Sequence, residues 1–393
     1  MMEGVYISRL RTGSFCSPGV YMEVMWKLVL AVVLAVALLC GGSDGQIGCR
    51  NEADQPVDWY ILYKLPAHTG IGDVYYYIDT KVQKMNTEMK PVKPINHQAG
   101  VLANTLAPYF NKEAGSGYIA YSDQPPTSNA LPEFGHSKGF VMMDQNSGFW
   151  LLHSTPRFPF DKASNNFFPE SGKENGQTFI CVTFPYATFK QIGLHLQYIH
   201  AHTFEHNIPD GFHNELKKAA KLKDGTKLKE PADIPKELYQ DLKSNANHPF
   251  RSFVKKVLDT ESDDEDCDDE KKRDLYFHIA QNIGSSVRAQ TWNQGNKFES
   301  EDPVYNVECI EVGGKKWNTN DHSKWCVSVD DKGPEYWTCF GDSNRARSQC
   351  KRRGGALCIQ DKTVNGIFKN FIKPKADCKK QSDQPSAPKK LRQ

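Results

Sequence analysis

The sequence predicts an α/β protein built from two similar halves. The first observation is an internal repeat, because His136-Ser137-Lys138 and His322-Ser323-Lys324 both begin the pattern H-S-K-x-x-V-x-x-D. A tryptophan follows each copy at nearly the same spacing, at Trp150 and Trp337. The second observation is length, since 393 residues suffice for two halves of ordinary domain size. The third is that strands, a helix and a hairpin carrying the motif are predicted in both parts of the chain.

Each copy of the motif is predicted to open a β-hairpin. Residues 140–143 lead through a turn into 149–152, and residues 326–329 lead through a second turn into 336–339. Because side chains alternate faces along a strand, the His and Lys of each copy share a face and the Ser points away. The repeat therefore predicts one imidazole beside one ammonium group, presented twice.

The other elements follow from local composition. Strands are predicted at residues 59–66, 73–79, 117–123, 178–184 and 286–292, where β-branched and aromatic residues are bounded by polar residues or Pro. Helices are predicted at residues 186–206, where apolar residues recur at helical spacing, and from residue 275 onward. Residues 160–177, rich in Ser, Asn, Gly and Pro, indicate an exposed loop.

Two imidazoles flanking one electrophile can divide the work of a double displacement. One attacks and forms a covalent intermediate, while the other protonates the leaving group and later activates water. The neighbouring Lys138 and Lys324 would neutralise an anionic centre such as a phosphodiester. This scheme needs no metal or other cofactor. Since a free imidazole titrates near pH ~6.5 and one of the two must be charged, the scheme predicts an acidic optimum.

Five stretches of the sequence are distinctive: V-D-W-Y with K-L-P at residues 57–66, G-H-S-K-G at 135–139, H-S-T-P-R-F-P at 153–159, D-H-S-K-W-C at 321–326 and W-T-C-F-G-D-S-N-R at 337–345. Together they resemble deoxyribonuclease II. The resemblance covers residues 49–378. It implies the phospholipase D-like arrangement, in which two similar α/β halves each supply one His-x-Lys to a shared site. It also implies an acid, metal-independent endonuclease whose substrate is DNA and whose products carry 3'-phosphate and 5'-hydroxyl ends.

One departure from the wider phospholipase D pattern concerns an aspartate. That pattern has Asp five residues after the Lys, where this chain has Met143 and Val329. Asp144 and Asp330 come one position later. An orienting role for these two aspartates is therefore not carried over.

The resemblance also assigns roles to individual residues. His322 is expected to be the nucleophile, a choice that the sequence by itself leaves open, and His136 the general acid and later the base. His153 belongs to the active region, either as a catalytic group or as a structural histidine. Substrate-binding residues are expected at Arg157, Asn344 and Arg345, and the basic run at residues 345–353 is a candidate for following the DNA phosphates.

The cysteines indicate an oxidising compartment. Nine of the 11 lie beyond the predicted signal peptide, and they show no C-x-x-C spacing. The resemblance implies three disulfides, Cys49 with Cys181, Cys309 with Cys378, and Cys339 with Cys358. It leaves Cys267, Cys326 and Cys350 unassigned.

The chain is expected to have four segments. Residues 1–45 hold an N-terminal extension and a signal peptide, whose apolar run at residues 28–40 is short for a membrane span of about 20 residues. The two halves follow at 46–205 and 206–378, and a disordered basic tail at 379–393. The chain is expected to be lysosomal or secreted, with no membrane span after cleavage. Secretion gains weight because no N-x-S/T glycan acceptor is present.

Other interpretations compete with this one. His202-Thr203-Phe204-Glu205-His206 matches H-x-x-E-H, a zinc-protease signature when it lies on a helix. The paired motifs would also suit an enzyme of phospholipase D type acting on a lipid phosphodiester. A DNA-binding or toxin-like protein without turnover would keep the basic patches alone. Residues 263–270 form an acidic block that would repel DNA, so they are expected in a surface insertion.

Overall fold

The computed structural model describes residues 46–70, 72–81, 94–159, 167–223, 238–255, 274–292, 297–330 and 336–382. The chain divides into two compact units, Met1–Gln46 and Ile47–Gln393, and the description below concerns the second. The predicted signal peptide, the acidic block, Cys267 and most of the predicted tail lie outside the described residues. Within the described ranges, no helix is long and apolar enough to cross a membrane.

The first sheet contains the first hairpin. Its strands, in the spatial order β2-β1-β6-β5-β4-β3-β7, are β1 (Trp59–Lys64), β2 (Tyr75–Asp79), β3 (Gly117–Ser122), β4 (Lys138–Met143), β5 (Ser147–His153), β6 (Gln177–Pro185) and β7 (Thr203–Asn207). All neighbouring strands are antiparallel. The predicted hairpin is confirmed as β4 and β5, whose register places Val141 opposite Trp150.

The second sheet contains the second hairpin. Its strands, in the order β11-β10-β14-β15-β16-β9-β8, are β8 (Tyr239–Lys243), β9 (Pro249–Val254), β10 (Val287–Gln290), β11 (Val304–Asn306), β14 (Trp325–Ser328), β15 (Trp337–Gly341) and β16 (Gly355–Gln360). Strands β12 (Ile310–Val312) and β13 (Lys315–Trp317) form a separate pair. The second predicted hairpin is confirmed as β14 and β15, although the middle of its turn lies outside the described residues.

The helices lie between and outside the sheets. They are α2 (Val101–Phe110), α3 (Ser171–Glu174), α4 (Phe189–Tyr198), α5 (Asn214–Ala219), α7 (Leu275–Ile283), α8 (Lys362–Phe371) and α9 (Lys375–Ser382), with 3₁₀ turns at Ala67–Thr69, Tyr186–Thr188 and Arg347–Gln349. Caps define their ends. Asp274 accepts from the backbone of Tyr276 to start α7, and Gly284, at φ +65°, ends it in the left-handed conformation that glycine tolerates.

The motif hairpins occupy the same place in both sheets. Strands β4 and β5 lie between β3 and β6, and strands β14 and β15 lie between β10 and β16. A helix precedes β3 and β10, and a helix follows β6 and β16. The repeat seen in the sequence thus extends to the order of the surrounding elements.

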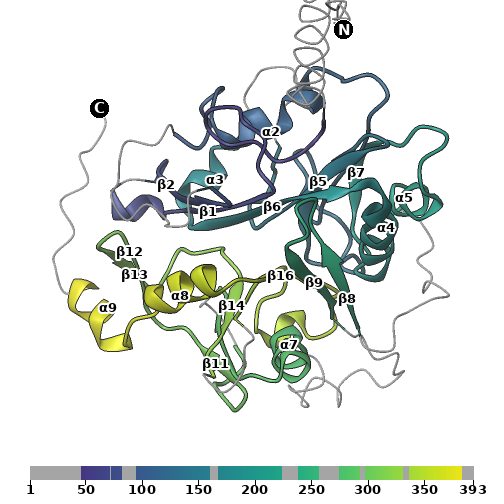
Figure 1. Cartoon of the computed structure of the whole chain (residues 1–393). Coiled ribbons are helices and arrows are strands. Elements are labelled where there is room, and N and C mark those ends of the chain that lie inside the picture. The colour runs from purple at the N-terminus through teal and green to yellow at the C-terminus, as the bar shows by residue number, and fades with distance from the viewer. Residues whose placement is uncertain are drawn as a thin grey trace, which may run out of the picture. The chain divides into compact units, whose positions relative to one another are not determined.

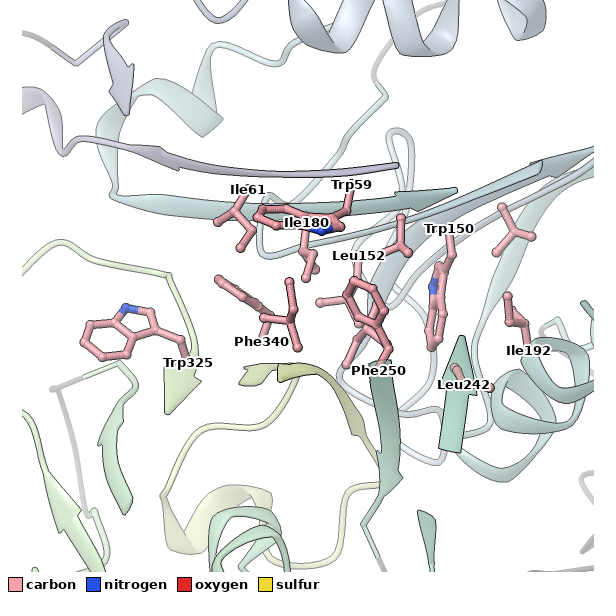
Figure 2. Packing of buried hydrophobic residues seen from close by; sticks show 14 of the residues in the cluster. Trp59, Ile61, Trp150, Leu152, Ile180, Ile192, Leu242, Phe250, Trp325 and Phe340 are labelled. Atoms are coloured by element: carbon pink, nitrogen blue, oxygen red, sulfur yellow. The ribbon is translucent and has the colours of Figure 1, made fainter. Parts of the chain in front are cut away.

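A shared core joins the two sheets. One hydrophobic cluster contains Ile61, Trp150 and Ile180 of the first sheet together with Phe340 of the second, and Figure 2 shows these side chains meeting between the sheets. Helices α4 and α8 contribute to the same cluster. Two further clusters cover the other faces, with α2 on the first sheet and α7 on the second (Figure 1). Because the core is continuous, the two sheets are held as one body.

Two predicted segments differ in extent from the observed elements. The helix predicted over residues 186–206 is α4, which ends at Tyr198, and the chain then turns through His200, at φ +45°, into strand β7. The pairing of β7 with β3 along the sheet edge outweighs the helical spacing of the sequence. The loop predicted over residues 160–177 contains the short helix α3.

Candidate active site

The first His-Ser-Lys lies at the start of β4, where the two sheets meet. The backbone N–H of His136 donates to the carbonyl of Arg353, which precedes β16 of the second sheet, at 2.9 Å. Gly135 fits this crowded place, because a Cβ there would lie 2.1 Å from the Ile199 carbonyl oxygen and 3.2 Å from that of Arg353. The C-terminal part of the chain therefore positions the first motif.

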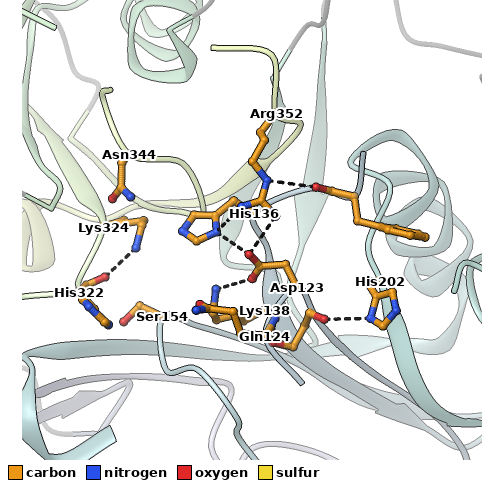
Figure 3. Close-up of polar contacts among 12 residues, drawn as sticks. Asp123, Gln124, His136, Lys138, Ser154, His202, His322, Lys324, Asn344 and Arg352 are labelled. Carbon is orange, nitrogen blue, oxygen red and sulfur yellow. Dashed lines mark hydrogen bonds and ion pairs between the residues drawn. The ribbon is translucent and has the colours of Figure 1, made fainter. Parts of the chain in front are cut away.

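His136 and Lys138 converge on the buried carboxylate of Asp123, just after β3. The Nδ1 atom of His136 lies 2.7 Å from Asp123 Oδ2, and Lys138 Nζ donates to Oδ1 at 2.5 Å (Figure 3). Arg352 reaches across from the second sheet, with Nη2 3.0 Å from Oδ2 and Nη1 3.3 Å from His136 Nδ1. One carboxylate thus orients three cationic or ionisable groups.

The charge state of Asp123 follows from these contacts. Burial raises the pKa of Asp123, but the charges of Lys138, His136 and Arg352 outweigh burial and hold that pKa well below its ordinary value. Asp123 is therefore an anion that accepts the Nδ1 proton of His136, so Nε2 is the nitrogen available for chemistry. Burial, then Lys138, lowers the pKa of His136 to about 3 against the opposing effect of Asp123.

The second His-Ser-Lys is held by residues of the first sheet. The backbone N–H of His322 donates to the Gly176 carbonyl at 2.8 Å. The buried Asp321 accepts from Tyr63 Oη of β1 at 2.5 Å and from Trp317 Nε1 at 2.7 Å, and its other oxygen accepts from the backbone of Ser323 at 2.8 Å. Each motif is therefore anchored to the opposite half of the fold.

The ring of His322 has a different environment from that of His136. It makes an edge contact with Trp292, at 4.5 Å between ring centroids, and no hydrogen bond within the described residues. Lys324 Nζ donates to the carbonyl of His322 at 3.0 Å. Burial, followed by Lys324, Lys138, His136 and Lys64, lowers the pKa of His322 to about 3. Burial and the surrounding positive charges therefore favour the neutral form of this imidazole.

The two pairs belong to one site. After burial and the nearest lysine, Lys324 contributes to lowering the pKa of His136, and Lys138 and His136 contribute to lowering that of His322. Such effects are large only at short range in a buried environment. Figure 3 shows His136, Lys138, His322 and Lys324 around one common space.

His153 ends β5, and the charge of Lys138 acts on its ring. Its ring packs against Phe158 and Phe179, with centroids 4.9 and 5.6 Å away, and only 2% of the residue is exposed. Burial, then the charge of Lys138, lowers the pKa of His153 to about 3. Neither ring nitrogen makes a well-formed hydrogen bond in the described structure.

The three residues expected to bind substrate lie in different settings. Arg157 is exposed, and its backbone N–H donates to the carbonyl of Gln124, next to Asp123, at 2.9 Å. Asn344 is partly buried, and Figure 3 shows it beside Lys324. Its Oδ1 accepts from the backbone of Trp292 at 3.2 Å.

Arg345 is placed differently from the expectation. It is 5% exposed, with Nε 2.7 Å from Asp274 and Nη1 2.6 Å from Asn306 Oδ1. Its remaining nitrogen, Nη2, donates to the carbonyl of Glu299 at 3.2 Å. These contacts give Arg345 a structural role, tying the loop after β15 to α7 and β11.

The zinc interpretation of H-x-x-E-H was wrong. The motif needs one helical turn to bring its two histidines together, but Thr203–Asn207 is strand β7. Residues four apart on a strand are separated by about 13 Å, too far to bind one ion. Glu205 accepts from Tyr109 and Tyr118, and His202 contacts the carbonyl of Ser122 at 3.1 Å. In the described residues no group of three His, Cys, Asp or Glu side chains could hold a metal ion.

The three expected disulfides are present. Cys49 bonds Cys181, Cys309 bonds Cys378, and Cys339 bonds Cys358 across β15 and β16. Of the unassigned cysteines, Cys350 is disulfide-bonded, and Cys326 is a buried free thiol opposite Cys339 in the sheet.

Asp123 and Arg352 lie in no motif that marks them as site residues. Asp123 was predicted only as the end of a strand, and Arg352 only as part of a basic run. They are 229 residues apart in sequence, and no local pattern links them.

The fold and the site define an α/β protein with a duplicated histidine–lysine centre. Residues 48–378 match the model of the Deoxyribonuclease II family, and the chain belongs to this family.

Its relatives align over nearly their whole length. Deoxyribonuclease-2-alpha of Sus scrofa is 31% identical over 92% of this chain and 97% of its own. Plancitoxin-1 of Acanthaster planci is 30% identical over 91% of this chain and 99% of its own. Deoxyribonuclease-2-beta of Mus musculus is 32% identical over 85% of this chain and 93% of its own. Yeast tyrosyl-DNA phosphodiesterase matches at a TM-score of 0.30, with 8% identity over 59% of this chain and 68% of that one, which is too low to assign the fold.

Proposed function

We propose that this protein is an acid, metal-independent endodeoxyribonuclease that hydrolyses DNA to 3'-phosphate and 5'-hydroxyl ends. The observation that carries the proposal is the meeting of two His-x-Lys pairs, one from each sheet, in a single site. Membership of the deoxyribonuclease II family, with relatives named for that activity, supports DNA as the substrate.

We further propose that the two halves form a phospholipase D-like pseudo-dimer. The equivalent places of the two motif hairpins in their sheets support this relation. So do the reciprocal anchors, in which His136 binds the backbone of the C-terminal half and His322 that of the N-terminal half. The boundary between the halves would fall after β7, slightly beyond residue 205.

In the proposed reaction, His322 attacks the phosphorus atom. The new N–P bond forms as the bond from phosphorus to the 5'-oxygen breaks, and His136 Nε2 gives its proton to that oxygen. His136 then accepts a proton from water, which attacks the phosphohistidine and releases the 3'-phosphate. A neutral His322 fits the first role, because the lysines around it oppose protonation and leave its lone pair available.

The proton donor must be charged when substrate is bound. Asp123 stabilises an imidazolium at His136, and His322 has no comparable carboxylate in the described residues. The pKa of His136 is about 3 without substrate, so free-imidazole titration near pH ~6.5 does not describe this site. A bound phosphodiester brings a negative charge that favours the imidazolium, so proton uptake would accompany binding.

The remaining site residues would bind and position. Lys138 and Lys324 would contact the non-bridging oxygens of the scissile phosphate. Arg157 and Asn344 would contact flanking parts of the DNA, since both lie next to site segments. We assign His153 a supporting role, because a ring with 2% exposure packed between two Phe side chains is poorly placed to touch substrate.

We propose lysosomal or secreted localisation. The disulfides support passage through an oxidising compartment, where such bonds form and persist.

The direct test is plasmid cleavage at pH 5 in excess EDTA, with end-group analysis of the products. The wild type is expected to leave 3'-phosphate ends, and His322→Ala to leave the plasmid intact. His206→Ala is the matched control, because this exposed histidine on β7 should be dispensable. Cleavage that requires a metal, or a fully active His322→Ala, would refute the proposal. Hydrolysis of a lipid phosphodiester but not of DNA would favour the phospholipase D-type alternative.

A further inference from the structure

We propose that Trp292 forms a nucleobase subsite beside the nucleophile, on which the base of the nucleotide that keeps the 3'-phosphate stacks during the reaction. The inference rests on the proposed function of the site, and it gives a binding role to a residue outside the His-Ser-Lys motifs.

The exposure of Trp292 sets it apart from the other tryptophans in the described part of the chain. Those others are buried in the hydrophobic clusters with at most 4% of each residue exposed, namely Trp59, Trp150, Trp317, Trp325 and Trp337. Trp292 is half-buried and belongs to none of the described clusters. Tryptophan suits a place where part of the ring meets solvent or a ligand, and it is enriched among residues that dominate binding.

The pairing of β10 brings Trp292 to the second His-Ser-Lys. Strand β10 runs antiparallel to β14, with Gln290 opposite Trp325. The chain beyond Gln290 therefore continues alongside the residues that precede β14, which are those of the motif. Trp292 comes two residues after Gln290 and so reaches the level of His322 and Lys324.

Two contacts fix Trp292 at the site. Its ring meets that of His322 with 4.5 Å between centroids and 66° between planes. Its backbone N–H donates to Asn344 Oδ1 at 3.2 Å, and Figure 3 shows Asn344 beside Lys324. Because site residues hold both the ring and the backbone, the indole is positioned before substrate arrives.

The contact with His322 leaves most of the stacking surface of the indole unused. In an edge contact one ring presents its edge to the other, so His322 covers at most one of the two indole faces. No second aromatic ring of the described residues packs on Trp292. An indole face next to a phosphate-binding site suits a nucleobase, because every base has a face that can stack on an aromatic ring.

The position of Trp292 favours the base on one side of the scissile bond. In the proposed reaction His322 bonds to phosphorus and keeps the nucleotide that carries the 3'-phosphate, whereas the 5'-oxygen leaves toward His136. The ring of Trp292 packs on His322 and not on His136. The base of the retained nucleotide is therefore the one that stacks, and the subsite detects the presence of a base rather than its identity.

The test compares the affinities of two small phosphates, measured by calorimetry at pH 5 in EDTA. Thymidine 3'-phosphate carries the base, and 1,2-dideoxyribose 3-phosphate is the same compound without it. Neither contains a phosphodiester, so the binding measurement does not depend on turnover. We expect the wild type to bind the thymidine compound about tenfold more tightly, a typical contribution of one base stacked on an aromatic ring.

Trp292→Leu should bring the two dissociation constants within about twofold of each other, because leucine can pack against His322 but offers no ring for stacking. Trp292→Phe keeps a smaller aromatic face and should retain most of the preference. Trp292→Met is the second variant should leucine prevent folding.

The matched control is Tyr305→Leu. Tyr305 is a half-buried aromatic residue on the neighbouring strand β11, and its hydroxyl donates to Asp302. Removing this ring should leave the preference for the thymidine compound as it is in the wild type.

Equal affinities of the two phosphates for the wild type would overturn the inference. So would a Trp292→Leu protein that keeps the preference, including one that loses affinity for both phosphates by the same factor, because the indole would then only support His322. Plasmid cleavage is a separate outcome. A protein that prefers the thymidine compound but cleaves no DNA would refute the proposed function alone, whereas cleavage without the preference would refute the subsite alone.

Discussion

The two His-Ser-Lys motifs have the same sequence and different surroundings. His136 is tied to the anionic Asp123, which also binds Lys138 and Arg352. The ring of His322 has no hydrogen bond in the described structure, and Lys324 donates to a backbone carbonyl. A duplicated motif can therefore take two chemical roles through its neighbours, because a carboxylate favours an imidazolium whereas lysines alone favour a neutral ring.

The largest effects are expected when each histidine is removed and the leaving group of the substrate is varied. We expect His322→Ala and His136→Ala each to lower kcat on DNA by about 10³-fold or more. A second substrate is thymidine 3'-(p-nitrophenyl phosphate), whose leaving group needs no proton. Of the two variants, only His136→Ala should release nitrophenol from it, in a first burst. Its phosphohistidine should accumulate, because the base for water is missing, and alkaline quenching should detect it. A burst from His322→Ala instead would reverse the two roles.

A smaller effect is expected at the carboxylate that distinguishes the motifs. Asp123→Asn keeps the shape but removes the charge that stabilises the His136 imidazolium, so kcat should fall about 10²-fold. The pH profile should move toward acid, because His136 would protonate less readily. The corresponding change at Arg352, to Met, removes a cation beside His136 and should move the profile in the opposite direction, toward neutrality. Profiles that move together, or not at all, would show that Asp123 does not tune His136.

The smallest effect concerns stability rather than catalysis. His195 of α4 is fully buried against Trp150, and burial lowers its pKa to about 3. In the unfolded chain the His195 imidazole takes up a proton near pH ~6.5, whereas in the folded chain it stays neutral. This contribution to the free energy of unfolding is therefore fully present above that pH and is lost as the pH drops toward 3. Between pH 7 and pH 5 this costs about 2 kcal/mol.

The free energy of unfolding should therefore fall between pH 7 and pH 5 by about 2 kcal/mol less in His195→Gln than in the wild type. Urea titration at both pH values measures it. The exposed His206→Gln should behave like the wild type. Identical pH dependence in all three proteins would show that the His195 ring does not stay neutral on folding.

The repeat and the local patterns predicted much of the fold. Both hairpins, the strands at residues 59–66, 73–79, 117–123 and 178–184, and the helix from residue 275 are present. These are segments whose apolar periodicity or β-rich composition agrees with their final environment. The helix predicted through residue 206 stopped early because β7 gains its stability from pairing with β3, a contact that no local pattern encodes.

The sequence predicted the histidines and lysines of the site, but it did not predict the residues that contact them. The internal repeat was enough to predict two imidazoles and two ammonium groups on matching hairpins, because strand alternation fixes which side chains share a face. The family resemblance added the three disulfide pairs. It did not anticipate that Arg345 would be buried against Asp274.

The histidine that is tied to a carboxylate could not be identified without the contacts between distant segments. Asp123 and Arg352 come from segments far apart in the chain, and they meet at His136 because the shared core brings the two sheets together. Burial in that place also shifts the pKa values of Lys324 and Asp342 to about 7 and about 8, which composition cannot reveal. The motifs identify the candidate reacting groups, whereas burial and neighbouring charges in the folded site set the protonation states of those groups.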